Sequence, residues 1–149
     1  MDDWAAYSEP VPGDGTCLYH SIAKHLGIGG HNLRQITHDF MKEYLESSLH
    51  GQSIRDWIQW DSKNCAENYI DGIKSGAWGG ALEITIIATI FRVPIFVYVA
   101  RKNACNQISE SIPDETLPFL NGFKTSPPYI CVLYNGKNHY EILHCKQSF

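Results

Sequence analysis

Residues 13–27, GDGTCLYHSIAKHLG, place a cysteine between a glycine-containing loop and a run of residues with helical periodicity. Apolar residues recur here at the spacing of one helix face, which predicts a helix from Thr16 or Cys17 to Leu26. The first turn of a helix has free N–H groups and the positive end of the helix dipole, and both favour a thiolate. Cys17 is therefore a candidate nucleophile, and we expect its small side chain to be exposed at the helix start.

Further helices are predicted to follow in the first two thirds of the chain. They are expected from about residue 32 to before Gly51, over SIRDWIQW (53–60) with a Ser cap, over 64–75 and over 81–91. Residues 7–12 are expected to form an extended entry.

Strands are predicted in the last third of the chain. PIFVYVA (94–100) is rich in β-branched and aromatic residues, as a buried strand is. YICVLYN (129–135) and HYEILHC (139–145) are predicted to form a hairpin around Asn135-Gly136-Lys137-Asn138. Residues 101–128 are expected to be a long polar connection. The order favours an α+β fold, or α/β, with a small mixed sheet flanked by helices.

Composition limits the class of protein. The chain has 149 residues, 44% of them hydrophobic and 19% charged, which fits a single globular domain over residues 1–149. The net charge is −4, and no basic stripe is present that would bind nucleic acid. We expect a monomer.

Location and redox state follow from three further features. The five cysteines are odd in number and widely spaced, so reduced thiols are expected rather than a disulfide framework. The longest apolar-rich run, 81–100, is broken by Glu83, Arg92 and Pro94 and is interpreted as a helix and a strand rather than a membrane span. The start, MDDWAAYSEP, has no apolar signal-peptide core. We expect an intracellular, cytoplasmic protein.

A cysteine nucleophile needs a base, and His139 is the best candidate among seven histidines. It starts the last predicted strand, where residues i and i+2 share a face, so Glu141 should lie beside it and orient its ring. His20 and His25 share the helix with Cys17 and should point away from its N-terminal end.

The sequence gives little support for a metal or cofactor. Cys17-x2-His20-x4-His25 and the adjacent pair His144-Cys145 lack the four-ligand spacing of zinc sites. Phosphate-loop and dinucleotide-binding patterns are absent from the sequence. No metal and no cofactor are expected.

Three segments together resemble the ovarian-tumour (OTU) family of cysteine deubiquitinases. GDGTCLYHSIA resembles the family's catalytic-cysteine motif, WGGALEITIIATIFRVPIFVY its second motif, and NHYEIL the motif of its catalytic histidine. They occur in family order across residues 12–144. The continuation YHSIA is closer to viral members of the family.

This resemblance implies a papain-like cysteine protease fold and an isopeptidase that acts on ubiquitin or a ubiquitin-like modifier joined to lysine. Cys17 would be the nucleophile and His139 the base. The oxyanion would be bound by backbone groups of Asp14, Gly15, Thr16 and Cys17. If the protein is viral or a bacterial effector, it would act in the host cytoplasm.

The substrate channel implied by the resemblance lies near Trp78, Gly79 and Gly80, with Tyr140 covering the ubiquitin tail. The alternative is that Trp78 plugs the core before a helix and that Tyr140 serves packing.

Two positions depart from the family pattern. Thr16 stands where Asn is usual, and Glu141 where Asp or Asn is usual. The extra methylene of Glu141 leaves Asp14 as an alternative orienter of His139. Two other functions also remain open: an inactive, OTU-like ubiquitin-binding module, and another Cys-His amidohydrolase.

Overall fold

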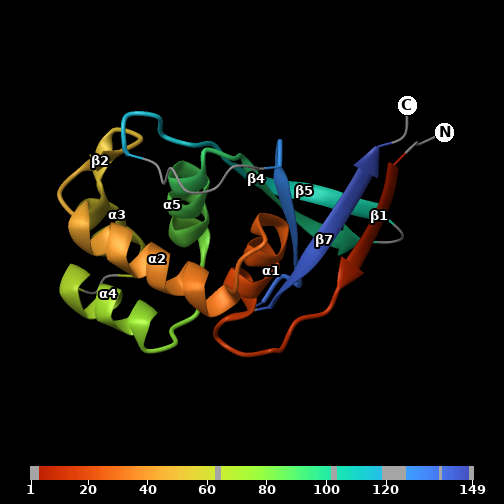
Figure 1. The fold of residues 1–149 in the computed structure, drawn as a ribbon, viewed down its shortest axis with the longest axis horizontal. Helices are drawn as coiled ribbons and strands as arrows, with labels where there is room; N and C mark the ends of the chain where they lie inside the picture. Colours follow the sequence, from red (N-terminus) through yellow and green to blue (C-terminus); the bar gives the residue numbers. More distant parts are fainter. Residues whose placement is uncertain (1–3, 63–64, 102–103, 119–126, 138, 148–149) are drawn as a thin grey trace.

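The structure is a computed structural model that describes residues 4–62, 65–101, 104–118, 127–137 and 139–147. A five-stranded mixed sheet lies on one side of the molecule, and helices lie on the other (Figure 1). This arrangement confirms the expected α+β class.

The helices agree closely with the sequence pattern. They are α1 (Cys17–Leu26), α2 (Gly30–Glu43), α3 (Ile54–Ser62), α4 (Ala66–Lys74) and α5 (Ala81–Phe91). The predicted Ser cap of α3 is confirmed, because the hydroxyl of Ser53 accepts a hydrogen bond of 3.1 Å from the N–H of Asp56. In contrast, α2 ends at Glu43, well before Gly51. A two-stranded ribbon of β2 (Ser48–Leu49) and β3 (Gln52–Ser53) follows α2, around Gly51.

The sheet has the strand order β1-β7-β6-β4-β5. Its strands are β1 (Trp4–Glu9), β4 (Ile95–Arg101), β5 (Ala104–Ser111), β6 (Ile130–Tyr134) and β7 (Tyr140–Gln147). β6 pairs antiparallel with β7, as the hairpin prediction required, and parallel with β4. Asn138 of the predicted turn lies outside the described residues.

The prediction of an irregular connection over residues 101–128 was wrong at its start. Residues 104–111 form β5, which pairs antiparallel with β4 at one edge of the sheet. The described side chains of 105–110 are exposed, so this edge strand lacks the apolar alternation that marks a strand in a sequence. At the opposite edge, β1 starts before the expected extended segment 7–12 and pairs with β7.

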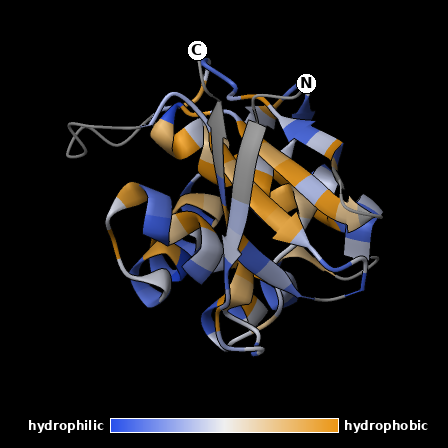
Figure 2. Cartoon of the chain, turned by 90° about the vertical axis from the view of Figure 1, so that its right-hand side faces the viewer, coloured by the Kyte–Doolittle hydropathy of each residue, from blue (hydrophilic) through white to orange (hydrophobic). Residues whose placement is uncertain are grey.

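The core lies between the sheet and the helices. α1 packs against β6 and β7, α5 contacts β4 and β5, and α2 packs on both of these helices. Apolar segments of the central strands lie among more polar outer helices and loops (Figure 2). Of the helices that the structure describes, none combines the length and apolar character needed to cross a membrane. This packing brings the start of α1 to the end of the sheet where β7 begins.

Candidate active site

Cys17 is the first residue of α1, as the sequence predicts. Its N–H lies 3.2 Å from the carbonyl oxygen of Asp14, which closes the preceding loop into a turn. The side chain therefore lies at the positive end of the helix dipole, where a thiolate is favoured.

The expected exposure of Cys17 was wrong, because the residue is only 1% exposed. The first turn of α1 is covered by the segment that leads into α5. A Cβ added at Gly79 would lie 2.6 Å from Cδ2 of Leu18, so this backbone passes directly over α1. The sequence pattern of α1 could not show this cover, which comes from residues about 60 positions away.

His139 and Glu141 form a pair at the start of β7. Nε2 of His139 lies 3.5 Å from Oε2 of Glu141, and both side chains are partly buried. The other ring nitrogen, Nδ1, is buried and has no hydrogen-bond partner among the described residues. The ring thus has one nitrogen facing a carboxylate and a second nitrogen available for another group.

The cysteine and the histidine come from elements that pack together. α1 contacts β7, and Tyr140, the neighbour of His139, is close enough to Cys17 to interact with it electrostatically. Burial, with contributions from Tyr134, Cys17 and Glu83, raises the pKa of Tyr140 to about 12. The structure therefore brings the predicted nucleophile and the predicted base to one end of the sheet.

Asp14 has a different environment from Glu141. Its Oδ1 accepts a hydrogen bond of 2.9 Å from the N–H of Thr16, and the residue is exposed. No contact between Asp14 and His139 is found among the described residues. Asp14 shapes the loop, whereas the carboxylate beside the imidazole is that of Glu141.

The loop before Cys17 is in close contact with the segment that follows α4. A Cβ added at Gly15 would lie 2.2 Å from the carbonyl oxygen of Gly76, so only glycine fits there without movement. The side chain of Arg34, from α2, donates hydrogen bonds to both segments. Sequence reasoning missed Arg34. The one signal was its position on the helix face that also carries buried Thr37, His38 and Met41.

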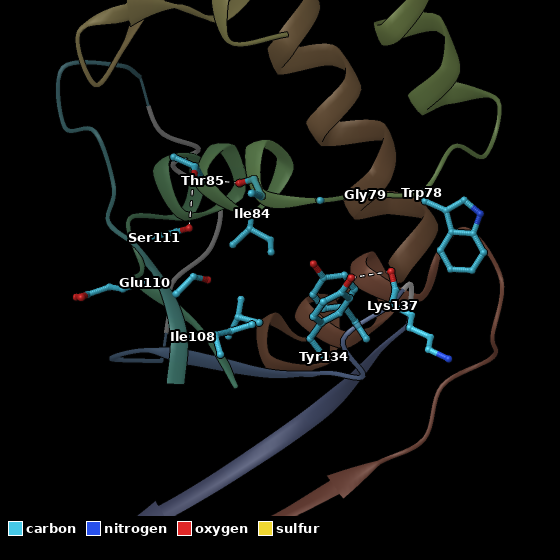
Figure 3. A pocket seen from close by; sticks show the side chains of 14 residues that line it. Trp78, Gly79, Ile84, Thr85, Ile108, Glu110, Ser111, Tyr134 and Lys137 are labelled. Carbon is cyan, nitrogen blue, oxygen red and sulfur yellow. Dashed lines mark hydrogen bonds between the residues drawn. The ribbon is translucent and has the colours of Figure 1, made fainter. Parts of the chain in front are cut away.

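The predicted channel residues line a groove with a volume of about 630 Å³ (Figure 3). The segment Trp78-Gly79-Gly80 and the start of α5 lie along one side, and Ile108 of β5 lies across from them. Trp78 is 49% exposed, which does not fit a plug in the core. Trp78 thus contributes apolar surface to the groove.

Two tyrosines lie in the groove at the end nearest the β6–β7 hairpin. The rings of Tyr134 and Tyr140 stack with centroids 4.7 Å apart, and the hydroxyl of Tyr134 donates a hydrogen bond of 2.7 Å to the carbonyl of Lys137 (Figure 3). Tyr140 therefore both packs in the hairpin and lines the groove.

A buried carboxyl group fixes the Trp78-Gly79-Gly80 side of the groove. Glu83, 1% exposed, accepts hydrogen bonds from the N–H of Gly80 (2.7 Å) and the hydroxyl of Tyr69 (2.5 Å). Burial raises the pKa of Glu83 above its usual range, although both hydrogen bonds act in the opposite direction. Glu83 anchors Gly80 at the point where the groove segment enters α5.

The remaining histidines and cysteines do not form a second reactive centre in the part of the chain that is described. His25 contacts the carbonyl of Cys131, and His144 lies 2.6 Å from Glu9. Within the described residues, no cluster of three or more potential metal ligands is found. Cys17 and Cys131 are buried, Cys65 and Cys105 are exposed, and the side chain of Cys145 lies outside the described set.

Comparison with known protein families gives a match over most of the chain. The sequence model of the family described as OTU-like cysteine protease matches residues 12–140. This range includes the Cys17 loop, the Trp78-Gly79-Gly80 segment and His139.

Curated relatives agree with this match. The chain is 29% identical to deubiquitinase OTUD6B of Xenopus laevis over 134 residues, covering 83% of this chain and 40% of the relative. It is 26% identical to ovarian tumor domain-containing deubiquitinating enzyme 4 of Arabidopsis thaliana over 145 residues, covering 93% and 43%. The chain thus spans less than half the length of these two relatives.

The fold also resembles solved structures. The Hazara virus OTU, solved bound to ubiquitin, superposes with a TM-score of 0.65 at 15% identity, covering 96% of this chain and 83% of that one. At this identity the likeness concerns the fold alone.

Proposed function

Because the chain belongs to the family of OTU-like cysteine proteases, we propose that it is a deubiquitinase. It hydrolyses the isopeptide bond between the C-terminus of ubiquitin, or a ubiquitin-like modifier, and a lysine. The observation that carries the proposal is the packing of α1, which begins at Cys17, on β7, at whose start the His139–Glu141 pair lies. The curated relatives named as deubiquitinases and the viral relative bound to ubiquitin support it.

In the proposed reaction, Sγ of Cys17 attacks the carbonyl carbon of the terminal glycine. The thiol proton passes to Nδ1 of His139, the buried nitrogen without a described partner. Glu141, beside Nε2, holds the ring and stabilises the imidazolium. The imidazolium then protonates the leaving lysine amine, and His139 activates the water that hydrolyses the thioester.

The negative oxygen of each tetrahedral intermediate is stabilised by the loop 14–17. Backbone N–H groups at the start of a helix are suited to this task, because they point toward a bound anion. The resemblance assigns the role to the backbone of Asp14, Gly15, Thr16 and Cys17. In the ground state, the N–H of Thr16 donates to the side chain of Asp14 and that of Cys17 to its carbonyl oxygen, which orders the loop. These two N–H groups must exchange or share their acceptors with the oxyanion when it forms.

The groove beside Trp78 and Tyr140 is the proposed path of the extended ubiquitin tail. Two terminal glycines have no side chains, so they suit the part of the groove that Gly79 and Gly80 line. The Trp78 and Ile108 side chains, both partly exposed, supply apolar contacts to the residues that precede these glycines.

The wider setting of the reaction is also part of the proposal. The odd number and wide spacing of the cysteines favour a reducing compartment, so we propose that the chain acts inside the cell. A net charge of −4 without a basic stripe favours a protein substrate over nucleic acid, and we propose a monomer that acts on ubiquitin conjugates.

A ubiquitin C-terminal vinyl sulfone or propargylamide probe tests the proposal. The expected result is a covalent adduct at Cys17, located by peptide mass spectrometry and absent from Cys17→Ala. Binding of ubiquitin without an adduct would favour an inactive ubiquitin-binding module. Failure to bind or react would favour another amidohydrolase. Cleavage of the eight diubiquitin linkages would then define the chain preference.

A further inference from the structure

Arg34 is a buried cation that the reaction described above does not use. It lies on α2 and is 5% exposed. Among the described residues it forms no ion pair with a carboxylate. Its guanidinium lies 4.5 Å from the ring centroid of Tyr19 and otherwise faces oxygen atoms of the backbone and of one hydroxyl. Burial of a cation is costly without such partners, so the position of this side chain is tightly specified.

The guanidinium joins two segments that border the candidate site. Nη2 donates to the carbonyl of Gly15 (2.5 Å) and to the hydroxyl of Thr16 (3.1 Å). Nη1 donates to the carbonyls of Ile73 and Ala77, at 2.8 Å each. One side chain therefore connects the loop before Cys17 to the backbone that continues into Trp78-Gly79-Gly80.

The bond to Gly15 determines how the loop presents its N–H groups. In a planar trans peptide, the carbonyl of Gly15 and the N–H of Thr16 point in opposite directions. Arg34 holds the carbonyl on one side, and Oδ1 of Asp14 accepts from the N–H on the other side. This peptide cannot rotate unless both hydrogen bonds break, so the backbone that enters Cys17 is fixed.

We propose that Arg34 is a positioning residue that holds the oxyanion loop and the groove segment in their catalytic arrangement. The proposal rests on the proposed function and assigns a role to a side chain outside the Cys-His-Glu set. Arg34 acts through the Gly15–Thr16 peptide and does not touch the substrate, since it is buried beneath both segments. Its loss should therefore affect the rate of the chemical step more than substrate binding.

The test compares Arg34→Met and Arg34→Lys with the wild type, using hydrolysis of a fluorogenic ubiquitin amide. Methionine keeps the length and removes every donor. Lysine keeps the charge, but one ammonium cannot reproduce the planar fork that joins two segments. We expect kcat to fall roughly 10- to 100-fold in Arg34→Met, less than for outright loss of an oxyanion donor. The kcat of Arg34→Lys should lie between that of the wild type and that of Arg34→Met. In both variants KM should change less than about threefold.

Arg92 provides a matched control. It is a partly buried arginine that, like Arg34, donates to backbone carbonyls, those of Thr89, Asp114, Glu115 and Leu117, but it lies at the far end of α5. Arg92→Met should lower the Tm as Arg34→Met does and leave kcat close to that of the wild type. All rates are measured well below the Tm of each variant.

A second readout separates positioning from general damage. In a Cys17→Ala background, Arg34→Met should leave the Kd for ubiquitin nearly unchanged. A wild-type kcat in folded Arg34→Met, or equal losses of kcat in the Arg34 and Arg92 variants, would overturn the proposal. If Arg34→Met does not fold, Arg34→Lys decides by the same criteria. Failure of the wild type itself to react with the ubiquitin probe would instead contradict the proposed function.

Discussion

Nε2 of His139 lies 3.5 Å from a carboxylate oxygen of Glu141, two residues further along the same chain. His139 immediately precedes β7 and Glu141 is the second residue of that strand, so one short stretch of backbone brings this pair together. The longer side chain of Glu141 therefore reaches the imidazole without help from another element. This contact predicts that Glu141 matters more for catalysis than Asp14 does.

We expect Glu141→Gln to lower kcat roughly ten- to a thousand-fold, or about 1.4 to 4 kcal/mol, with little change in KM. The amide oxygen can still accept a hydrogen bond from the ring, but it lacks the negative charge that stabilises an imidazolium, whose formation belongs to the transition state. Asp14→Asn should have a smaller effect, because the amide oxygen can still accept from the N–H of Thr16. Steady-state kinetics on a ubiquitin amide measure both. A steep loss in Asp14→Asn beside a neutral Glu141→Gln would reverse the assignment.

Cys17→Ala should lower kcat on the order of a million-fold, as loss of the nucleophile does in other catalytic triads. The change removes one sulfur atom from a buried position, so a modest fall in Tm is expected rather than unfolding. Ubiquitin affinity should remain. The measurements are probe labelling, the Tm and titration with ubiquitin, and substantial turnover in this variant would show that Cys17 is not the nucleophile.

His139→Ala should match Cys17→Ala in severity, because the thiol then has no base. His144→Gln is the matched control, since His144 lies on β7 only five residues after His139 and also faces a carboxylate, that of Glu9 at 2.6 Å. The control should keep most of its kcat. A severe loss at His144 with a mild loss at His139 would contradict the choice of base.

Gly15→Ala should lower kcat at least tenfold, comparable to loss of an oxyanion donor, because the new Cβ would collide with the carbonyl of Gly76. Gly13→Ala is the control in the same loop, since a Cβ there would meet nothing within 4 Å. The two variants make the same chemical change two residues apart. Equal activities would show that the contact between the loop and Gly76 does not matter for catalysis.

Glu83→Gln should stabilise the protein at neutral pH, by about 1 kcal/mol or roughly 2–4 °C in Tm. The side chain is buried, and its raised pKa means that the folded state favours the protonated, neutral form. Protonated Glu83 contributes its full stabilisation at pH values below the pKa that this group has in the unfolded chain. The contribution is lost as the pH rises through the pKa of Glu83 in the folded state. The Tm advantage of Glu83→Gln should therefore grow from about pH 4.5 to pH 8. Glu83→Ala should be destabilised, because the N–H of Gly80 loses its acceptor.

The sequence by itself determined most of the local structure. α1, α5 and the β6–β7 hairpin carry complete signals within a few residues of one another: helical periodicity with a stop, or apolar strands around Asn-Gly. The relation of His139 to Glu141 is also local, since the two residues are only two positions apart at the start of β7. The motif order that indicated the family likewise needed no tertiary information.

Tertiary packing decided what distant residues contribute. β5 is a polar edge strand whose pairing with β4 comes from backbone hydrogen bonds that side-chain patterns do not encode. Cys17 is buried because the segment around Gly79 crosses α1, and Arg34 reaches the catalytic loop only because α2 packs on α1. Local periodicity reports which face of an element is apolar. It does not report which other element covers that face, and this is the physical reason why only the folded structure revealed these contacts.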